Sequence, residues 1–264
     1  DDNGNITTCT QDITVTADEL PGITCSADQT QTADALSCDA VVTVVGPVTD
    51  DNCAVASVVN DITGTSDASG TYNVGTTTIT WTVTDIHGNT NTCTQDITVT
   101  DDEDPTITCA ADQTQTADAG VCEALVTVVA PTTGDNCGVS TTLNDYNNTS
   151  DASDIYPVGT TTITWTVTDI HGNTNTCTQD ITVTDDEAPV ANCQDITVNL
   201  DPNTGTASIV GTDVDNGSTD NCGIVSYSVT PNSFTSADLG DNTVTLTVTD
   251  AAGNSSTCTS TVLI

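Results

Sequence analysis

The feature that most constrains this chain is a word-for-word internal repeat. The stretch Val74–Glu103 recurs unchanged at Val158–Glu187, 84 residues further on. The same step relates the cysteines Cys9, Cys93 and Cys177, then Cys25, Cys109 and Cys193, then Cys38 and Cys122, then Cys53 and Cys137, with Cys222 one residue late. Identity at so long a fixed interval predicts whole small domains in tandem. We place repeat 1 at residues 18–101, repeat 2 at 102–185 and repeat 3 at 186–264.

Within each repeat, apolar and polar residues alternate with a period of two. In Thr76–Asp85 the side chains of Ile79, Trp81 and Val83 fall on one face and threonines on the other, and Thr92–Thr100 alternates likewise. This pattern predicts half-buried strands, joined here by a tight hairpin. Further strands are expected at Ile23–Cys25, Gln29–Asp34, Ala40–Gly46 and Val55–Asp61. Short strands without any helical period predict an all-β fold, with tandem immunoglobulin-like β-sandwiches in a rod.

Composition limits the partners and the compartment. The chain has no Lys or Arg against 38 Asp and Glu, for a formal charge of −38. Nothing in it can neutralise phosphate, which excludes nucleic acid and anionic membrane surfaces as partners. No apolar run is long enough to span a bilayer. Twelve cysteines without CxxC pairs predict disulfides, and hence an extracellular or cell-surface location.

Several motifs together resemble the hyalin repeat and related bacterial immunoglobulin-like repeats. They are the DxxxP motif at Asp101–Pro105, the DNC motif ending at Cys53, Cys137 and Cys222, and the stretch VGTTTITWTVTDIHGN with the cysteine after it. The resemblance implies tandem extracellular architecture and an adhesion or stalk module without enzymatic activity, and it names no ligand. Repeat 3 departs from the pattern, because it has Leu246 in place of the tryptophan and no equivalent of Cys38.

The hairpin suggests one disulfide scheme. If the DNC loop and the start of the last strand lie at one pole, we expect Cys53–Cys93, Cys137–Cys177 and Cys222–Cys258, with Cys25–Cys38 and Cys109–Cys122 joining the first two strands. A rival scheme pairs all cysteines in order from Cys9–Cys25. It asks Cys9 to reach across seven strand residues of about 3.3 Å each, whereas bridged Cα atoms lie within about 7 Å, so we favour the first scheme.

The favoured scheme leaves Cys9 and Cys193 without partners. Either Cys9 pairs upstream in a longer chain while Cys193 is a buried thiol, or the two bridge neighbouring subunits. Residues 1–17 match the final hairpin loop and last strand of a repeat, which makes them an orphan strand with an open hydrogen-bonding edge. We expect either excision from a longer array or docking of this strand on a neighbouring molecule, although repeat 3 has a last strand of its own.

Acidic residues gather where an immunoglobulin sandwich would bring the linker and two loops to one pole. In repeat 1 these are Asp18, Glu19, Asp50, Asp51, Asn52, Asp85 and Asn89; in repeat 2, Asp101, Asp102, Glu103, Asp104, Asp135, Asn136, Asp169 and Asn173; in repeat 3, Asp185, Asp186, Glu187, Asp213, Asp215, Asp220, Asn221 and Asp250. Calcium takes six to eight oxygen ligands of this kind, and magnesium demands a tighter octahedron. The alternatives are calcium at the junctions or solvated acidic loops without an ion.

Other candidates for chemistry favour structural interpretations. His87 and His171 sit in the hairpin loop, and we expect surface turn residues rather than metal ligands. Mid-strand Trp81 and Trp165 suit core packing better than sugar stacking, and no nucleophile elbow is present. Glycan acceptor patterns begin at Asn5, Asn147, Asn148, Asn216 and Asn254.

The sequence therefore predicts an extracellular structural protein rather than an enzyme. We expect a disulfide-stapled, calcium-rigidified rod that forms part of a surface fibre or adhesin stalk, with other copies of itself or further repeats as partners. The alternatives are a glycan- or protein-binding adhesion module, with repeat 3 as its tip, and a non-catalytic appendage of a larger secreted enzyme.

Overall fold

The computed structural model of the protein describes residues 2–4, 6–16 and 18–264. The chain forms two compact units, and each is described by itself. The first unit comprises Asp1–Asp104, Asp135–Gly138 and Asp169–Asn173, and the second comprises Pro105–Gly134, Val139–Thr168 and Thr174–Ile264.

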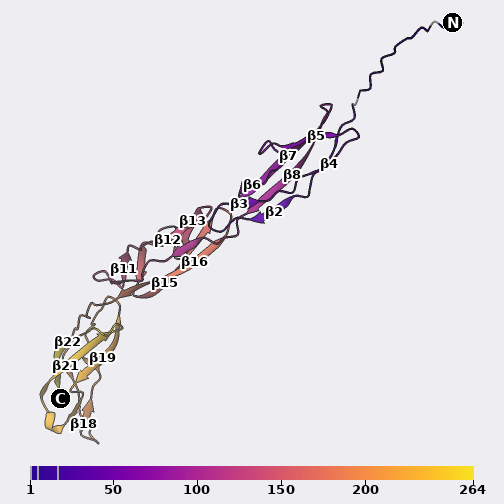
Figure 1. Ribbon diagram of the computed structural model, residues 1–264. Helices are drawn as coiled ribbons and strands as arrows, with labels where there is room; N and C mark the ends of the chain where they lie inside the picture. The colour runs from indigo at the N-terminus through magenta and orange to yellow at the C-terminus, as the bar shows by residue number, and fades with distance from the viewer. Residues whose placement is uncertain (1, 5, 17) are drawn as a thin grey trace. The chain divides into compact units, whose positions relative to one another are not determined.

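Repeat 1 lies in the first unit and is a β-sandwich (Figure 1). Its strands are β1 (Gly22–Thr24), β2 (Gln29–Thr32), β3 (Asp39–Val42), β4 (Val48–Asp50), β5 (Val55–Asn60), β6 (Gly70–Asn73), β7 (Gly75–Asp85) and β8 (Thr90–Thr100). One sheet has the order β2-β8-β7-β5, with β2 parallel to β8 and the other pairs antiparallel. The short pairs β3-β6 and β1-β4 form the opposite layer. The predicted all-β, immunoglobulin-like class is confirmed.

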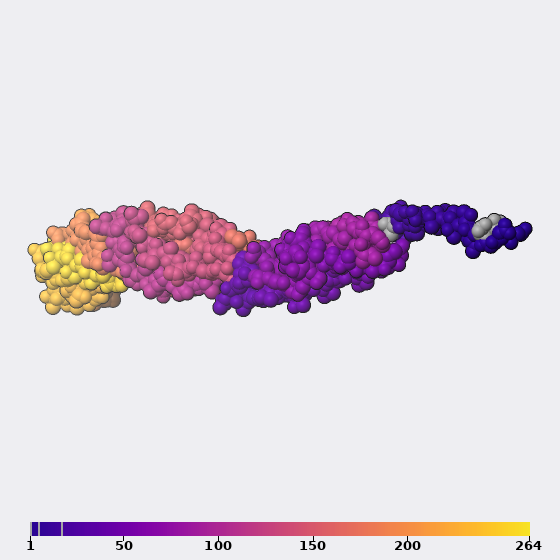
Figure 2. All heavy atoms as spheres, turned by 45° about the horizontal axis from the view of Figure 1, so that its top comes forward, coloured from indigo at the N-terminus to yellow at the C-terminus, as the bar shows by residue number. Residues whose placement is uncertain are grey.

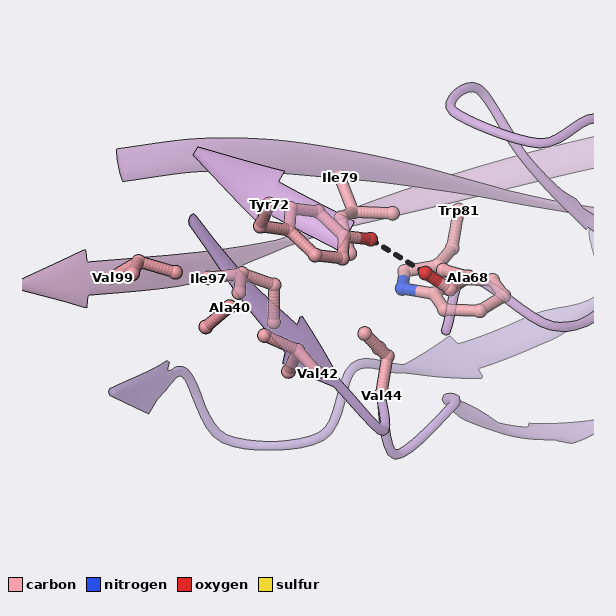
Figure 3. Packing of buried hydrophobic residues seen from close by; sticks show 9 residues of the cluster. All are labelled: Ala40, Val42, Val44, Ala68, Tyr72, Ile79, Trp81, Ile97 and Val99. Carbon is pink, nitrogen blue, oxygen red and sulfur yellow. Dashed lines mark hydrogen bonds between the residues drawn. The ribbon is translucent and has the colours of Figure 1, made fainter. Parts of the chain in front are cut away.

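The core of repeat 1 fills the space between these layers, as Figure 3 shows. Ile79, Trp81 and Val83 are each at most 1% exposed, so the predicted apolar face of β7 is confirmed. The polar end of each large ring has a partner: the Trp81 indole N–H donates to Gln95 Oε1 at 3.3 Å, and the Tyr72 hydroxyl donates to a backbone carbonyl at 2.6 Å. Such partners allow large aromatic rings to be buried without an unsatisfied polar atom.

The second unit contains the strands of repeat 2 and repeat 3. Repeat 2 has β9 (Thr106–Thr108), β10 (Gln113–Thr116), β11 (Glu123–Val126), β12 (Thr132–Gly134), β13 (Val139–Asn144), β14 (Asp154–Pro157), β15 (Gly159–Asp169) and β16 (Thr174–Thr184). The sheet order β10-β16-β15-β13 repeats that of β2-β8-β7-β5, and Trp165 occupies the place of Trp81. The identical stretches therefore build the same sandwich twice.

Repeat 3 keeps the sheet but changes the core. Its elements are β17 (Ile196–Thr197), β18 (Thr206–Ser208), α1 (Gly211–Val214), β19 (Ile224–Thr230), β20 (Ser233–Thr235), η1 (Ser236–Asp238), β21 (Asp241–Asp250) and β22 (Ser255–Leu263). Leu246 is fully buried at the tryptophan position, and Ser260 replaces the glutamine that accepts the indole hydrogen bond. The short helix α1 was not predicted. It packs closely because Gly211 lacks a Cβ, which would lie 2.7 Å from the Tyr227 carbonyl carbon.

The N-terminal segment differs from the predicted strand. Residues 2–4 and 6–16 are exposed, as the indigo end of the chain in Figure 2 illustrates, and none of them belongs to a strand. A strand needs a neighbouring strand to satisfy its backbone groups, and none of the strands β1 to β22 pairs with this segment. Asp1, Asn5 and Ala17, which complete the predicted orphan strand, lie outside the described residues. Docking of this segment on another molecule stays a prediction.

Candidate cation sites and disulfides

One set of disulfides staples each sandwich internally. The pairs are Cys25–Cys93, Cys109–Cys177 and Cys193–Cys258, with Cα–Cα distances of 5.8, 5.8 and 5.9 Å. Cys93 lies in β8 opposite Trp81 and on the same face as Gln95, so its sulfur points into the sandwich rather than toward the DNC loop. Cys25 follows β1 and packs against the same core.

The predicted pairings are therefore wrong. This correction applies to Cys53–Cys93, Cys137–Cys177, Cys222–Cys258, Cys25–Cys38 and Cys109–Cys122. The inward direction of the last-strand cysteine makes the first-strand cysteine its nearest partner. Cys193 is consequently neither a buried thiol nor a bridge between subunits, because it is bonded to Cys258.

A second set of disulfides joins cysteines that belong to successive repeats in the sequence. Cys38 bonds to Cys137 within the first unit, and Cys122 bonds to Cys222 within the second. Both Cα–Cα distances are 4.7 Å, and the partners are 99 and 100 residues apart. Among the described cysteines, Cys9 and Cys53 are free and exposed. Each DNC loop except the first is thus tied to the loop before β3 or β11.

Carboxylates gather beside both of these inter-repeat disulfides. The first acidic group consists of Asp101, Asp135 and Asp169, all within the first unit, and the second consists of Asp185, Asp220 and Asp250 in the second unit. In each group, one oxygen from every residue lies within 4.8 Å of the others. The local sequence explains the gathering, because each group takes one residue after a last strand, one from a DNC loop and one from the end of the long central strand.

The second acidic group has oxygens that no donor in the protein reaches. Asp220 Oδ2 accepts the N–H groups of Cys222 and Gly223 at 2.8 Å, but Asp220 Oδ1 is buried without a hydrogen bond. Asp185 is 7% exposed, and its Oδ2 is likewise buried and unpartnered. The amide oxygen of Asn221 is a third such atom. Buried oxygens without donors are costly, and a bound cation would satisfy them.

The first acidic group repeats this arrangement with one addition. Asp135 Oδ2 accepts two backbone N–H groups at 2.7 and 2.8 Å, while Asp135 Oδ1 and Asn136 Oδ1 are buried without partners. His171 is the addition, with Nδ1 2.9 Å from Asp101 Oδ2. It lies in an exposed turn, as His87 does. Cys137 is also near, but its sulfur is engaged in the disulfide.

The third carboxylate of each group is held ionised by its own hairpin turn. Burial raises the pKa of Asp250, but hydrogen bonds from the Asn254 side chain and from backbone N–H groups outweigh it, and the pKa lies below 3.8. The same balance, with Asn173 as the side-chain donor, lowers the pKa of Asp169. Asp85 in repeat 1 behaves alike, with Asn89 donating. These residues therefore carry their negative charge at neutral pH.

Repeat 1 departs from the expected third site. Asp51 and Asp85 occupy the DNC and strand-end positions, but the position of Asp101 is taken by Ala17 in the sequence. Among the described residues, carboxylates gather at the two places named above and not at this pole. The other predicted residues here serve local contacts: Asn52 Nδ2 donates to Glu19 Oε2 at 2.6 Å, and Asp50 packs against Gly22, where a Cβ would meet its Oδ1. Asp18 is outside both acidic groups.

The remaining predicted ligands also lie outside the two groups. Glu103 and Glu187 each accept a backbone N–H from a cysteine-bearing loop, and Asp213 and Asp215 accept hydrogen bonds in the turns around α1. Asp102, Asp104 and Asp186 are exposed. Asn173 donates to the Asp101 carbonyl, so it braces the first group. The repeat period correctly identified which residues are equivalent in the three repeats. It could not show which side-chain oxygens point into the two acidic groups and which point away from them.

The donor set narrows the choice of ion. The second group offers carboxylate and amide oxygens, and alanine stands where the first group has His171. An ion common to both sites must therefore be satisfied by oxygen alone, which favours calcium over zinc. The chain has no Lys or Arg that could neutralise either group instead.

Comparison with known proteins agrees with this architecture. The sequence profile of the HYR domain matches residues 18–99 and 100–183. The chain belongs to the HYR domain family. The two matched segments correspond to the first two predicted repeats, and the hyalin-repeat resemblance is thereby confirmed. No curated protein matches the chain.

Solved structures that align with the chain include tandem extracellular cadherin domains. Protocadherin gamma B2 extracellular cadherin domains 1–5 align over 92% of this chain at 15% identity and a TM-score of 0.32. Mouse cadherin-23 EC22–24 aligns over 93% of this chain and 99% of its own at 13% identity and 0.36, and titin domains I67–I69 over 92% and 98% at 8% and 0.35. The chain spans 59% of the protocadherin gamma B2 structure and 50% of the protocadherin gamma B4 extracellular domain.

Two features of the chain are typical of extracellular or cell-surface proteins. The described residues form five disulfides, which persist in oxidising compartments, and HYR domains fill most of the length of the chain. Among the described residues, no helix is both long enough and apolar enough to cross a membrane.

Proposed function

We propose that this chain is a load-bearing segment of an extracellular fibre or adhesin stalk, and that calcium held by the two acidic groups reinforces its repeat joints. One observation carries the proposal. In both groups, buried oxygens of an aspartate and the following asparagine lack any donor, in a chain without a single Lys or Arg. Leaving several negative or polar oxygens buried and uncompensated costs several kcal/mol (about 1–3 for each atom), and a calcium ion would remove that cost.

The position of the groups supports a role in the joints rather than in chemistry. Asp135 and Asp220 each lie two residues before a cysteine that is bonded to the preceding repeat in the sequence. The same loop therefore carries a covalent tie and an ion ligand. Oxygen ligands drawn from a linker, a DNC loop and a strand end would hold those three segments together when the ion binds. A structural role follows naturally from two equivalent copies of one arrangement.

Calorimetric titration of calcium into chelator-stripped protein tests the ion sites. We expect two sites per chain, because repeat 1 has Ala17 where a third carboxylate is needed. The Asp220→Asn variant should bind one ion fewer, while the exposed Asp186→Asn control should bind as many as the parent. The proposal fails if no saturable binding is found, or if Asp220→Asn leaves the stoichiometry unchanged.

Hydrogen exchange tests the mechanical part of the proposal. Calcium should slow exchange at the amides of Asn221, Cys222 and Gly223, whereas the amides in the middle of β21 should be unaffected. Negative-stain electron microscopy of the native material in millimolar calcium then addresses assembly. Ordered filaments are expected for a fibre segment, and isolated particles at every calcium concentration would contradict the fibre role.

A further inference from the structure

The free thiol of Cys53 stands out because both of its counterparts are bonded. The DNC motif occurs three times, and Cys137 and Cys222 each pair with a cysteine 99 or 100 residues earlier. Cys53 is exposed and free. The structure thus contains the same disulfide-linked interface twice. It contains the DNC side of that interface, which we call the receiving side, a third time without the cysteine-bearing loop that fills it.

The two filled interfaces share more than the disulfide. In the first unit, Asn136 Nδ2 donates to the Ser37 carbonyl at 2.9 Å, and Glu103 Oε2 accepts the Leu36 N–H at 2.9 Å. The second unit repeats both contacts. Asn221 Nδ2 donates to the Val121 carbonyl at 3.1 Å, and Glu187 Oε2 accepts the Gly120 N–H at 2.8 Å. The receiving side is therefore a glutamate, an asparagine and a cysteine in fixed relation, and the incoming side is the loop that ends in Cys38 or Cys122.

Repeat 1 presents the same receiving side without an incoming loop. Its members are Glu19, Asn52 and Cys53, at the positions of Glu103, Asn136 and Cys137. The two polar groups that would bind the incoming backbone bond to each other instead, with Asn52 Nδ2 2.6 Å from Glu19 Oε2. Asp51 Oδ2 accepts the Cys53 and Ala54 N–H groups at 2.8 Å, as in the bonded loops, so the loop is already shaped.

Two further observations compare this surface with the filled interfaces. Asp51 Oδ1 is buried without a hydrogen-bond partner, as Asp135 Oδ1 and Asp220 Oδ1 are in the bonded loops, so the three loops share one local shape. An open pocket of about 380 Å³ lies beside Asp51 and is lined by Glu19, Leu20, Gly22, Asp50, Asp51 and Asn52, whereas the corresponding pocket of the second unit is about 240 Å³ and is lined in part by Gly120 of the incoming loop. The receiving side is thus preformed, and its hollow is larger where no incoming loop lies.

We propose that Glu19, Asn52 and Cys53 form a docking surface for the cysteine-bearing loop of another hyalin repeat, and that docking is sealed by a disulfide to Cys53. The occupant must carry a free cysteine at the position of Cys38. A second copy of this chain does not supply one, because Cys38 and Cys122 are both bonded and repeat 3 has Gly205 at that position. The partner is therefore a repeat that has the cysteine-bearing loop of repeats 1 and 2. The cysteine of that loop must not already be bonded to the DNC loop of a following repeat.

The chemistry balances with a disulfide oxidant such as glutathione disulfide. The Cys53 thiolate attacks one sulfur of the oxidant and releases one glutathione thiolate. The thiolate of the incoming loop then attacks the mixed disulfide at the Cys53 sulfur and releases the second glutathione. Two protein thiols lose two electrons and two protons, and one glutathione disulfide becomes two glutathione thiols.

The test adds one repeat in front of the complete chain. Residues 18–84, with Cys53→Ser in the added copy only, are fused before Asp1, so that residues 1–17 complete the added repeat in sequence. After refolding in a glutathione redox buffer, thiols are alkylated and peptides are mapped by mass spectrometry. The parent chain should show two reactive thiols, Cys9 and Cys53, and the extended chain none. Cys53 should be recovered in a disulfide with the added copy of Cys38.

Two further chains keep the result decisive. Cys38→Ser in the added copy should leave Cys53 reactive while Cys9 stays protected by the added copy of Cys25. A second extension uses residues 102–168, with Cys137→Ser in the added copy, and presents the loop of Cys122 instead. The proposal is wrong if Cys53 stays fully reactive both in the chain extended by residues 18–84 with only Cys53→Ser and in the chain extended by residues 102–168. Calcium is omitted throughout, so failure here is distinct from failure of the ion sites.

Discussion

Replacing Asp185 by asparagine should stabilise the protein without calcium and lose most of that advantage when calcium is present. Asp185 Oδ1 accepts two hydrogen bonds, from Glu187 N–H at 3.1 Å and from Asn221 Nδ2 at 3.3 Å, and an asparagine oxygen can keep both. The second carboxylate oxygen is buried without a partner beside Asp220 and Asp250. In the variant, an amide N–H₂ takes that place and can donate to a neighbouring carboxylate. The substitution therefore removes one charge and one unsatisfied atom while it preserves the local turn.

The magnitude follows from the separation of the carboxylates. At 4.8 Å, two unit charges repel by about 1 kcal/mol in water and by about 3.5 kcal/mol at an effective dielectric constant of about 20. Removing one of three charges relieves two such pairs, so the calcium-free variant should be more stable by about 2 kcal/mol or more. With calcium in about 10- to 100-fold excess over Kd, binding stabilises the parent by about 1.4 to 2.7 kcal/mol at each site. The variant should lose most of this gain at its altered site.

Thermal unfolding in chelator and in calcium measures both effects. A change of 1 kcal/mol in the free energy of unfolding moves the Tm by about 2–4 °C in a unit of about 150–250 residues. The expected shifts are therefore well resolved. Asp186→Asn is the matched control, because it changes the same charge at an exposed neighbour. An Asp185→Asn variant that is destabilised equally in both conditions would refute the reasoning, since it would show that the carboxylate acts through local structure alone.

Further predictions concern stability at low and at high pH, the packing of the core and an inter-repeat disulfide. The pKa of Asp250 lies below 3.8, so its contribution to stability should be present above that pH and disappear as the pH falls further, as circular dichroism melts at successive pH values can check. Burial, with nearby Tyr146 and aspartates, raises the pKa of Tyr156 to about 12; its contribution to stability should be complete below pH 10 and vanish toward pH 12. Near-ultraviolet phenolate absorbance should show Tyr156 titrating late, together with Tyr72, whose pKa burial also raises. Trp165→Ala should cost about 3–5 kcal/mol in chemical denaturation, because the ring is fully buried. Replacing Cys38 and Cys137 together by serine should cost about 4.7 kcal/mol by the loop-entropy relation, and an unchanged midpoint would contradict it.

The sequence predicted the sandwich well because its signal is local. The alternation around Trp81 fixes which face of β7 is buried, and a period of 84 residues requires the same fold to recur. The acidic poles were also predictable, since chain topology brings a linker and two loops together. Which of these acidic residues join a group depends on the direction of each side chain, which the sequence does not show. Glu103, for example, binds a backbone N–H instead of joining Asp101 in the first acidic group.

The disulfides were not predictable from spacing, for a definite reason. In a tandem array, a cysteine within a repeat and its copy one period later are equivalent in sequence, so spacing cannot tell Cys53 from Cys137 as the partner of Cys38. Repeat 3 held part of the missing signal. It retains Cys193, Cys222 and Cys258 but has no equivalent of Cys38, so a pair between the equivalents of Cys25 and Cys38 cannot be general to the repeats. The absence of a third acidic group could also be predicted from the sequence, because Ala17 occupies the position in repeat 1 that corresponds to Asp101.

The inter-repeat disulfides give the chain a redundancy that a simple string of domains lacks. Between Cys38 and Cys137 the polypeptide and the sulfur bridge form a closed covalent ring that contains the exposed linker residues Asp102 and Asp104. A peptidase that nicks this linker would open the ring without severing the molecule, and the pieces would separate only under reducing conditions. The ring from Cys122 to Cys222 protects the linker at Asp186 in the same way. Damage outside the cell would then have to break both the linker peptide and the disulfide of one ring before the strand parted.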